Sequence, residues 1–392
     1  MSAARNEPVR PAAKRVLIVG GTGSVGRRIG ALLAEELGPD LLIAGRNAGR
    51  ARRAATALGH GVEGRALDVA EPDGFAAALE DVGMVVVCVD TADLKFAHAC
   101  ITRGISYIDI TATYAVIERL GFLGDLACAH GATVISSVGL APGLTNLMAK
   151  ACRDTSDVWR LDVHLLFGLG DRHGKAALEW MVDRLSRPFD VATPHGTRTA
   201  RPFADESTAN FPSPYGRRST YRFDFSDQHT LPTTLDVDSV STWTTYDRAG
   251  VARMMSVLAR VGLFRWTRNR LVRRLVANAL RVLRAGSDRF AVSVEGLVVA
   301  KEPVSVGVTA TGRQEAHGTA VMTAETVRRV RATAPPAGVY QLDELYALDD
   351  FEDALAANAI SIERHSPGPS GAERQVPPAA SSDTVNAGGA RR

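Results

Sequence analysis

Three glycines near the start of the chain have the spacing of a dinucleotide-binding turn. The apolar run 15–19 leads into Gly21-x-Gly23-x-x-Gly26, and apolar residues at helical spacing follow. The first glycine permits a tight turn, the second lets the backbone approach phosphates, and the third lets the helix pack close to the strand. The helix N-terminus adds free N–H groups and a positive dipole end. The predicted pyrophosphate site comprises Gly20, Gly21, Thr22, Gly23, Ser24, Val25 and Gly26.

The end of the second predicted strand favours NADP(H) over NAD(H). Strand 41–44 is followed by Gly45-Arg46-Asn47, at a place where NAD sites usually carry an acidic residue for the ribose 2′-hydroxyl. A guanidinium there binds a 2′-phosphate through paired, charge-assisted hydrogen bonds. We therefore expect Arg46 and Asn47 to contact the cofactor. Most of the arginines that follow are interpreted as a solvated helix face: Arg50, Arg52 and Arg53.

Strands and helices alternate over the first 150 residues. Apolar runs at 84–89, 105–110 and 133–137 predict buried strands beyond a third strand at 64–67. Helical segments are expected at 94–103 and 116–130. Six strands separated by helices predict an α/β fold with a doubly wound parallel (Rossmann) sheet.

The loops after these strands carry the residues expected around the nicotinamide and the substrate, because ligands bind beyond the carboxyl ends of parallel strands. Hydride transfer to a C=N or C=O group also needs a proton donor within hydrogen-bond reach. Asp109 is the first candidate and Tyr114 the second, with capping of the following helix an open alternative for Asp109. The other residues placed here are Asp68, Val89, Asp90, Thr91 and Gly143 for the cofactor, and Asp93, Thr111 and Asn146 for the substrate.

Beyond residue 150, apolar residues alternate with period two at 159–167, 221–225 and 304–310. This pattern predicts an inserted α+β domain with a largely antiparallel sheet. The segment 187–218 is rich in Pro and Thr and is interpreted as a loop. The expected organisation is a flexible N-terminus (1–13), the Rossmann domain (14–150), a substrate and dimerisation domain (151–335), a helical return packing on the first domain (336–365) and a disordered tail (366–392).

Two basic segments have more than one interpretation. Arg172, His173 and Lys175 lie in a glycine-rich loop before a helix, which suits a substrate carboxylate but also an ordinary surface loop. Segment 251–285 has nine arginines, no acidic residue and an apolar stripe at helical spacing. It is interpreted as a membrane-surface or acidic-ligand patch, a subunit contact, or an amphipathic helix with a solvated face.

Composition narrows the class of protein. A formal net charge of +3 gives no argument for nucleic acid, and no apolar run is long enough to span a bilayer. The four cysteines form no CxxC pair, which predicts neither a disulfide framework nor a metal site and suits a reducing compartment. The first residues are polar and lack a secretory signal pattern. We therefore expect a cytoplasmic protein whose partners are a small-molecule substrate and, in a homodimer, a second copy of the chain.

Several motifs together resemble the saccharopine dehydrogenase-like oxidoreductases of the saccharopine reductase type. They are the glycine turn at 20–26, the helix and strand at 97–109 ending in Tyr107-Ile108-Asp109, the Gly-x-x-Pro-Gly-x-x-Asn turn at 139–146, and the closing segment 338–340. The resemblance implies a Rossmann domain with an inserted α+β domain and NAD(P)-dependent hydride transfer at the carbon of a C–N bond in amino-acid-derived substrates.

Two loops depart from that family pattern. The usual Gly-Glu after Asp109 is absent, and 90–93 replaces a usual Gly-Pro. The sequence therefore predicts the chemistry but not the substrate. A carbonyl reductase on the same scaffold, and a non-catalytic NADP(H)-binding module that docks on a membrane or partner, remain alternatives.

Overall fold

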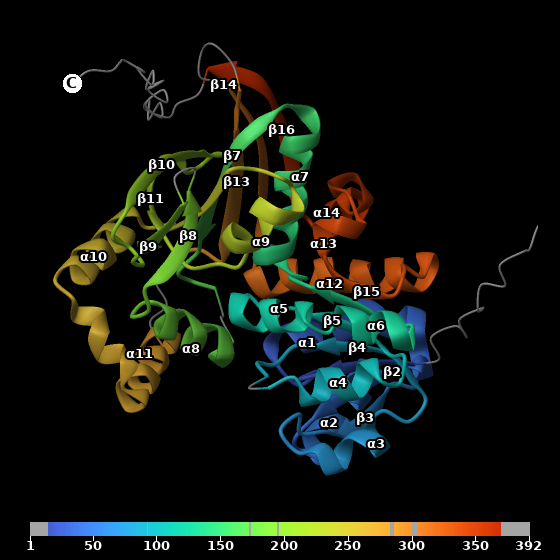
Figure 1. The fold of residues 1–392 in the computed structure, drawn as a ribbon. Coiled ribbons are helices and arrows are strands. Elements are labelled where there is room, and N and C mark those ends of the chain that lie inside the picture. The colour runs from blue at the N-terminus through green and yellow to red at the C-terminus, as the bar shows by residue number, and fades with distance from the viewer. Residues whose placement is uncertain are drawn as a thin grey trace, which may run out of the picture.

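Two seven-stranded sheets form the body of the molecule (Figure 1). The computed structural model describes residues 15–91, 93–171, 174–193, 196–282, 286–299 and 304–369. Among these residues, no helix is both long and apolar enough to cross a bilayer.

The first sheet is parallel throughout, in the order β3-β2-β1-β4-β5-β6-β15. The strand order reverses direction between β1 and β4, as in doubly wound nucleotide-binding folds. The predicted fold class is confirmed. The strands are β1 (Arg15–Val19), β2 (Leu41–Gly45), β3 (Glu63–Ala66), β4 (Val82–Val87), β5 (Ser106–Asp109), β6 (Thr133–Ser136) and β15 (Gly338–Gln341).

Helices cover both faces of this sheet, because every strand except the edge strands β3 and β15 buries apolar side chains on both sides. Their bounds are α1 (Ser24–Leu37), α2 (Ala48–Leu58), α3 (Phe75–Ala78), α4 (Lys95–Ile101), α5 (Tyr114–Gly121) and α6 (Gly124–His130). Helix α7 (Thr145–Thr155) follows β6 and packs against the other sheet.

The second sheet has the order β10-β11-β12-β7-β13-β14-β16 and is antiparallel except for the β12–β7 pair. Its strands are β7 (Val158–Phe167), β10 (Glu206–Phe211), β11 (Gly216–Arg222), β12 (Ser239–Tyr246), β13 (Arg289–Val298), β14 (Val304–Arg313) and β16 (Ser361–Pro369), and β8 (Phe189–Thr193) with β9 (Gly196–Ala200) forms a separate hairpin. The remaining helices are α8 (Lys175–Arg184), α9 (Asp227–Thr234), α10 (Ala249–Arg260), α11 (Arg270–Val282), α12 (Glu315–Thr333), α13 (Leu342–Leu345) and α14 (Glu352–Ala357).

The two sheets share one apolar core. A single cluster runs from Ile18 and Leu33 in the first sheet and α1 to Leu161 and Val292 in the second sheet. Helix α12 packs against α1 and also contacts β14, so it joins the two parts. The ion pair of Arg328 with Glu36, at 2.7 Å, adds a polar link along the same contact.

Four stretches differ from their sequence-based predictions. Residues 187–218 form the strands β8 to β11 rather than a loop, because Phe189, Val191 and Ala200 alternate with polar residues and bury one face. Residues 338–362, predicted helical, begin with β15, which extends the first sheet beside β6. Residues 366–369, assigned to the tail, continue β16 along β14. The helix expected at 116–130 is divided into α5 and α6.

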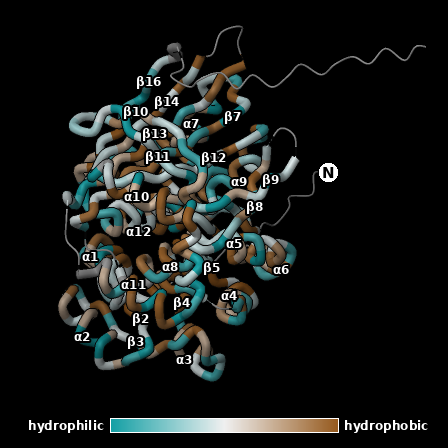
Figure 2. The backbone as a smooth tube through the Cα atoms, turned by 90° about the vertical axis from the view of Figure 1, so that its left-hand side faces the viewer, coloured by the Kyte–Doolittle hydropathy of each residue, from teal (hydrophilic) through white to brown (hydrophobic). Residues whose placement is uncertain are grey.

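The basic segment is also divided. Helix α10 gives way at Gly262 to a short 3-10 helix (Leu263–Arg268), which α11 follows. Residues 249–282, which we call the arm, lie at the left edge of Figure 1 and on the side that faces the viewer in Figure 2.

Candidate functional site

The glycine turn between β1 and α1 has the steric requirements expected of a pyrophosphate site. Gly20 has a φ of +78°, which L side chains rarely adopt, and its N–H donates to Ala44 O at 3.1 Å. A Cβ on Gly26 would lie 2.6 Å from Gly20 O and 2.7 Å from the Cα of Gly21, so α1 can approach the turn only with glycine there. The first turn of α1 has no acidic residue to compete with a phosphate.

The end of β2 presents unpaired positive charge beside this turn. Arg46 is exposed and makes no hydrogen bond or ion pair with the described residues. Asn47 caps α2, since its side chain accepts a hydrogen bond from Arg50 N at 2.9 Å. A cavity of about 410 Å³ borders Gly21 and Thr22 and is also lined by Arg50 and Arg53. Arg50 and Arg53, expected mostly on a solvated helix face, therefore border this cavity.

Asp109 ends β5 at the carboxyl edge of the sheet and is buried. Its Oδ1 accepts a hydrogen bond from Thr111 N at 2.8 Å, and its Oδ2 accepts one from the Tyr107 hydroxyl at 3.2 Å. Burial raises the pKa of Asp109 to about 7; the two hydrogen bonds oppose this shift, and the charge of Asp90 adds to it. Asp109 can therefore hold a proton near neutral pH and release it there.

The loop after β4 lies between the glycine turn and Asp109. Val89 packs against Gly20, and its contact with the cofactor stays a prediction. Asp90 has an exposed surface, and partial desolvation of its carboxylate by the surrounding protein raises its pKa. Arg184 of the second domain lowers the pKa of Asp90, and Glu179 raises it. Thr91 is half-buried in the same loop.

The turn after β6 is held by buried polar contacts. Gly143 has a φ of +126°, and its N–H donates to Asn146 Oδ1 at 3.2 Å. The Nδ2 of Asn146 donates to Asp343 Oδ1 at 2.9 Å, and Asn146 is fully buried. Asn146 thus positions the turn, while its contact with substrate stays a prediction.

Three other predicted residues make local contacts. Thr111 is buried, and its Oγ1 accepts a hydrogen bond from Thr113 N. Asp93 caps the start of α4 through Lys95 N, and this hydrogen bond lowers the pKa of Asp93. Asp68 caps the turn after β3 through Ala70 N. Each of these three side chains already has a hydrogen-bond partner within the protein. The roles of Thr111, Asp93 and Asp68 in binding stay predictions.

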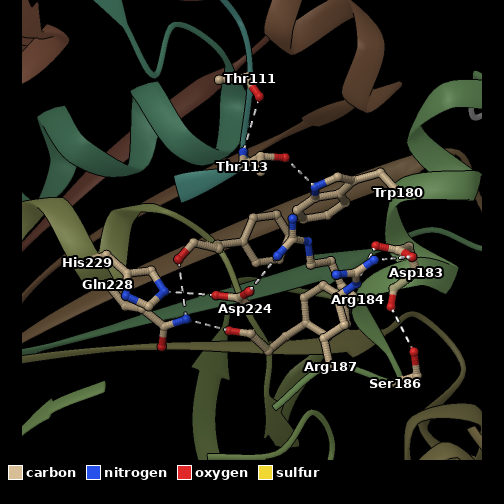
Figure 3. Close-up of polar contacts among 12 residues, drawn as sticks. Thr111, Thr113, Trp180, Asp183, Arg184, Ser186, Arg187, Asp224, Gln228 and His229 are labelled. Carbon is tan, nitrogen blue, oxygen red and sulfur yellow. Dashed lines mark hydrogen bonds and ion pairs between the residues drawn. The ribbon is translucent and has the colours of Figure 1, made fainter. Parts of the chain in front are cut away.

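Tyr114 meets a polar cluster that the sequence analysis missed. Its ring stacks on His229 of α9, with centroids 4.6 Å apart. His229 lies 2.8 Å from Asp224 Oδ1, and Arg184 Nη1 donates to Asp224 Oδ2 at 3.2 Å (Figure 3). The Nε1 of Trp180 in α8 donates to Thr113 Oγ1 at 3.0 Å, which ties the two domains together at the carboxyl edge.

A cavity of about 550 Å³ opens beside this cluster. Its wall carries Arg184, Arg187 and Arg268 together with Asp183 and Asp224. Arg184 and Arg187 are paired with carboxylates, whereas the Arg268 guanidinium donates only to Ser186 O, at 3.4 Å, among the described residues. No motif marked these residues in the sequence, because they come from α8, the arm and the strand end before α9. The lining residues are Asp183, Arg184, Ser186, Arg187, Pro188, Phe189, Asp224 and Arg268.

The predicted carboxylate-binding loop is only partly described. Arg172 and His173 lie outside the described residues, and Lys175 begins α8 without a described side chain. Gly174 lies against Ser24, since a Cβ on Gly174 would be 3.5 Å from that of Ser24. This loop therefore ends beside the glycine turn.

A doubly wound sheet with this turn places the chain in the class of dinucleotide-binding proteins. Within that class, residues 16–135 match the family model described as the saccharopine dehydrogenase NADP binding domain. The match confirms the resemblance inferred from the sequence and confirms NADP(H) as the cofactor of the domain. The chain therefore carries the nucleotide-binding domain of an oxidoreductase family.

Solved structures extend the likeness in fold beyond that domain. Apo saccharopine dehydrogenase (L-Glu forming) from Saccharomyces cerevisiae is similar with a TM-score of 0.66 and 13% identity, covering 90% of this chain and 100% of that chain. An amine dehydrogenase from Mycobacterium smegmatis aligns with a TM-score of 0.45 and 12% identity, covering 86% and 97%. At such identities the first likeness shows the fold alone. No curated protein matches the sequence.

Proposed function

We propose that this protein is an NADP(H)-dependent oxidoreductase that transfers hydride to or from the carbon of a C–N bond in a small amino-acid-derived substrate. The observation that carries the proposal is Asp109, a buried carboxyl with a pKa of about 7 at the carboxyl edge beside the glycine turn. Imine reduction needs one hydride and one proton. The bound cofactor supplies the hydride, and this chain must supply the proton.

Asp109 is the proposed proton source. Its carboxyl prefers the neutral form because it is buried, so the acid form persists near neutral pH. Tyr114 is the second candidate, since it stands half-buried in the cleft against His229. In amine oxidation the same groups would accept the proton.

The facing side of the cleft suits an amino acid. The guanidinium groups of Arg184 and Arg268 can pair with a carboxylate, and the carboxylate of Asp90 can pair with an ammonium group. The positive charge of Arg184 lowers the pKa of Asp90, so charges of both signs act in this part of the molecule. A small zwitterion matches that arrangement. A cytoplasmic location and a homodimer are retained as parts of the proposal.

NADPH consumption at 340 nm tests the proposal. Purified protein is given NADPH and a panel of keto acids, each with and without an amine. Amine-dependent consumption supports C–N chemistry, whereas consumption with the keto acid alone identifies a carbonyl reductase. Tight NADPH binding without turnover on any member of the panel would instead indicate a non-catalytic module.

A further inference from the structure

The arm gathers most of the large apolar side chains that the protein exposes. Of the nine such side chains among the described residues, seven lie between residues 254 and 275. Trp266 is 64% exposed, and Leu271 and Leu275 are each 69% exposed. The other four are Met254, Val257, Val261 and Leu263. Monomeric proteins rarely leave so many large apolar groups exposed in one segment, so an occupant of this surface is expected.

Positive charge surrounds these apolar groups. No acidic residue occurs between Arg248 and Gly286. The arginines with exposed side chains in the arm are Arg253, Arg260, Arg265, Arg268, Arg270 and Arg274. The occupant must therefore carry negative charge beside apolar material.

The spacing puts both kinds of side chain on the same exposed faces. In α10, Met254, Val257 and Val261 recur at three- and four-residue steps, which is one face of a helix. In α11, the exposed Leu271 and Leu275 form one row at a four-residue step, and the exposed Arg270 and Arg274 form an adjacent row. Trp266 lies in the 3-10 helix between them, and indole rings favour the boundary between water and lipid.

We propose that the arm docks on the surface of an anionic phospholipid bilayer. Apolar side chains of such helices enter the boundary between headgroups and acyl chains, and arginines pair with lipid phosphates. A second copy of this chain fits less well, because an isologous contact would set the arginines of one arm against those of the other. Nucleic acid would satisfy the arginines but not the row of apolar groups.

The arm is fixed to the wall of the candidate site. Arg273 forms an ion pair with Asp183 of α8, and the Thr267 hydroxyl donates to Val182 O at 3.2 Å. Helix α8 also supplies Trp180 and Arg184 to the cleft. Docking would therefore hold the cavity near the bilayer without requiring the arm to detach.

Vesicle sedimentation tests the proposal with the full chain. Vesicles of phosphatidylcholine alone are compared with vesicles that contain 30% phosphatidylglycerol, at low and at high salt. We expect binding to the anionic vesicles that weakens at least tenfold in high salt. Brominated phosphatidylcholine in those vesicles should quench tryptophan emission, and Trp266→Phe should remove most of that quenching.

Paired variants separate the apolar contribution to vesicle binding from the electrostatic contribution. Leu271→Ser/Leu275→Ser and Arg270→Gln/Arg274→Gln should each reduce vesicle binding at least tenfold, with NADPH affinity unchanged. Phe122→Ser, which alters an 80% exposed side chain elsewhere, and Arg103→Gln/Arg217→Gln, which removes two exposed charges elsewhere, should bind like the wild type.

Several results would overturn the proposal. They are no binding to anionic vesicles, equal loss in the control variants, or binding to duplex DNA in preference to vesicles. An oligomer in solution that the Leu271→Ser/Leu275→Ser variant dissociates, with vesicle binding absent, would assign the surface to a second copy.

Discussion

Asp109 shows how far a single residue can be interpreted from sequence. Its place after a β-branched run predicts a carboxylate at the ligand edge of a parallel sheet, and the structure places it there. The sequence does not reveal the burial that raises its pKa to about 7, because that burial arises only once the surrounding elements have packed together. His229 and Asp224 could not be predicted for the same reason. His229, which contacts Asp224, meets Tyr114 only after the second domain folds onto the first.

Asp109→Asn should lower NADPH turnover at least about 100-fold while NADPH affinity is retained, because the proton donor is lost. In the wild type, the rate of imine reduction should fall as pH rises through about 7, as the carboxyl loses its proton. Rate measurements from pH 5.5 to 8.5 check this. A variant that keeps the wild-type rate and the same pH profile would transfer the role to Tyr114, which Tyr114→Phe then tests.

The Asp109→Asn variant should also be more stable than the wild type at pH 8. The folded pKa of Asp109 lies above its unfolded value, so stability is fully present at low pH and is lost as pH rises through about 7. Asn carries no charge to desolvate. Thermal unfolding at pH 5 and pH 8 should show the difference growing with pH, and a difference that shrinks with pH would contradict this assignment.

Arg46→Ala should narrow the preference for NADPH over NADH by about tenfold or more, because a charge-assisted contact with the 2′-phosphate is lost. Arg52→Ala removes an exposed arginine from the face of α2 and serves as the matched control. Titration calorimetry with both nucleotides makes the comparison. Equal affinities for wild type and Arg46→Ala would point to Arg50 and Arg53 instead.

At the scale of elements, the strands of residues 15–137 were predicted well because strand, turn and helix alternate with strong signals. The glycine turn, β1, β2, β4 and β6 all lie where the pattern places them. The hairpins between residues 189 and 222 were missed, since Thr and Arg on their exposed faces hide the alternation of a few buried side chains. Pro and Thr content alone favoured a loop.

Gly26→Ala should weaken NADPH binding at least about 100-fold and destabilise the fold by about 1–3 kcal/mol, because the new methyl group meets the backbone of Gly20 and Gly21. Gly121→Ala adds the same methyl group to α5 with nothing within 4 Å, and it should bind NADPH normally. Titration calorimetry measures the NADPH affinity, and chemical unfolding measures the free energy of unfolding. Unchanged NADPH affinity in Gly26→Ala would refute the turn as the pyrophosphate site.

Arg184→Gln should raise KM for a carboxylate substrate about tenfold or more with a smaller change in kcat, because the cavity wall then loses a cation that can pair with the substrate carboxylate. Arg187→Gln, whose side chain is more exposed and pairs with Asp183, should raise KM less. Steady-state kinetics with the active substrate of the panel distinguish them. Equal effects in both variants would place the carboxylate at the rim of the cavity.

At the scale of the whole molecule, the chain runs from the first sheet to the second and then adds a final strand to each sheet. Strand β15 re-enters the first sheet beside β6, and β16 then closes the edge of the second sheet beside β14. The prediction of a helical return at 336–365 did not include β15, because this strand has only four residues and short helices follow it. Because the chain crosses between the sheets in this way, we expect the two sheets to unfold together.

Thermal unfolding should therefore show one cooperative transition. The core cluster that joins both sheets cannot be lost in one part alone. NADPH at 100 times its Kd should stabilise the whole chain by about 2.7 kcal/mol. Differential scanning calorimetry with and without NADPH measures both. Two transitions, with only one moved by NADPH, would contradict a shared core.

The most direct test of the account follows deuterium from the C4 position of reduced NADP into product. With the keto acid and amine panel, we predict a product one mass unit heavier on the carbon that bears nitrogen, formed by the wild type and at least about 100-fold more slowly by Asp109→Asn. NADPH that binds tightly and yields no deuterated product with any member of the panel would contradict the proposed hydride transfer.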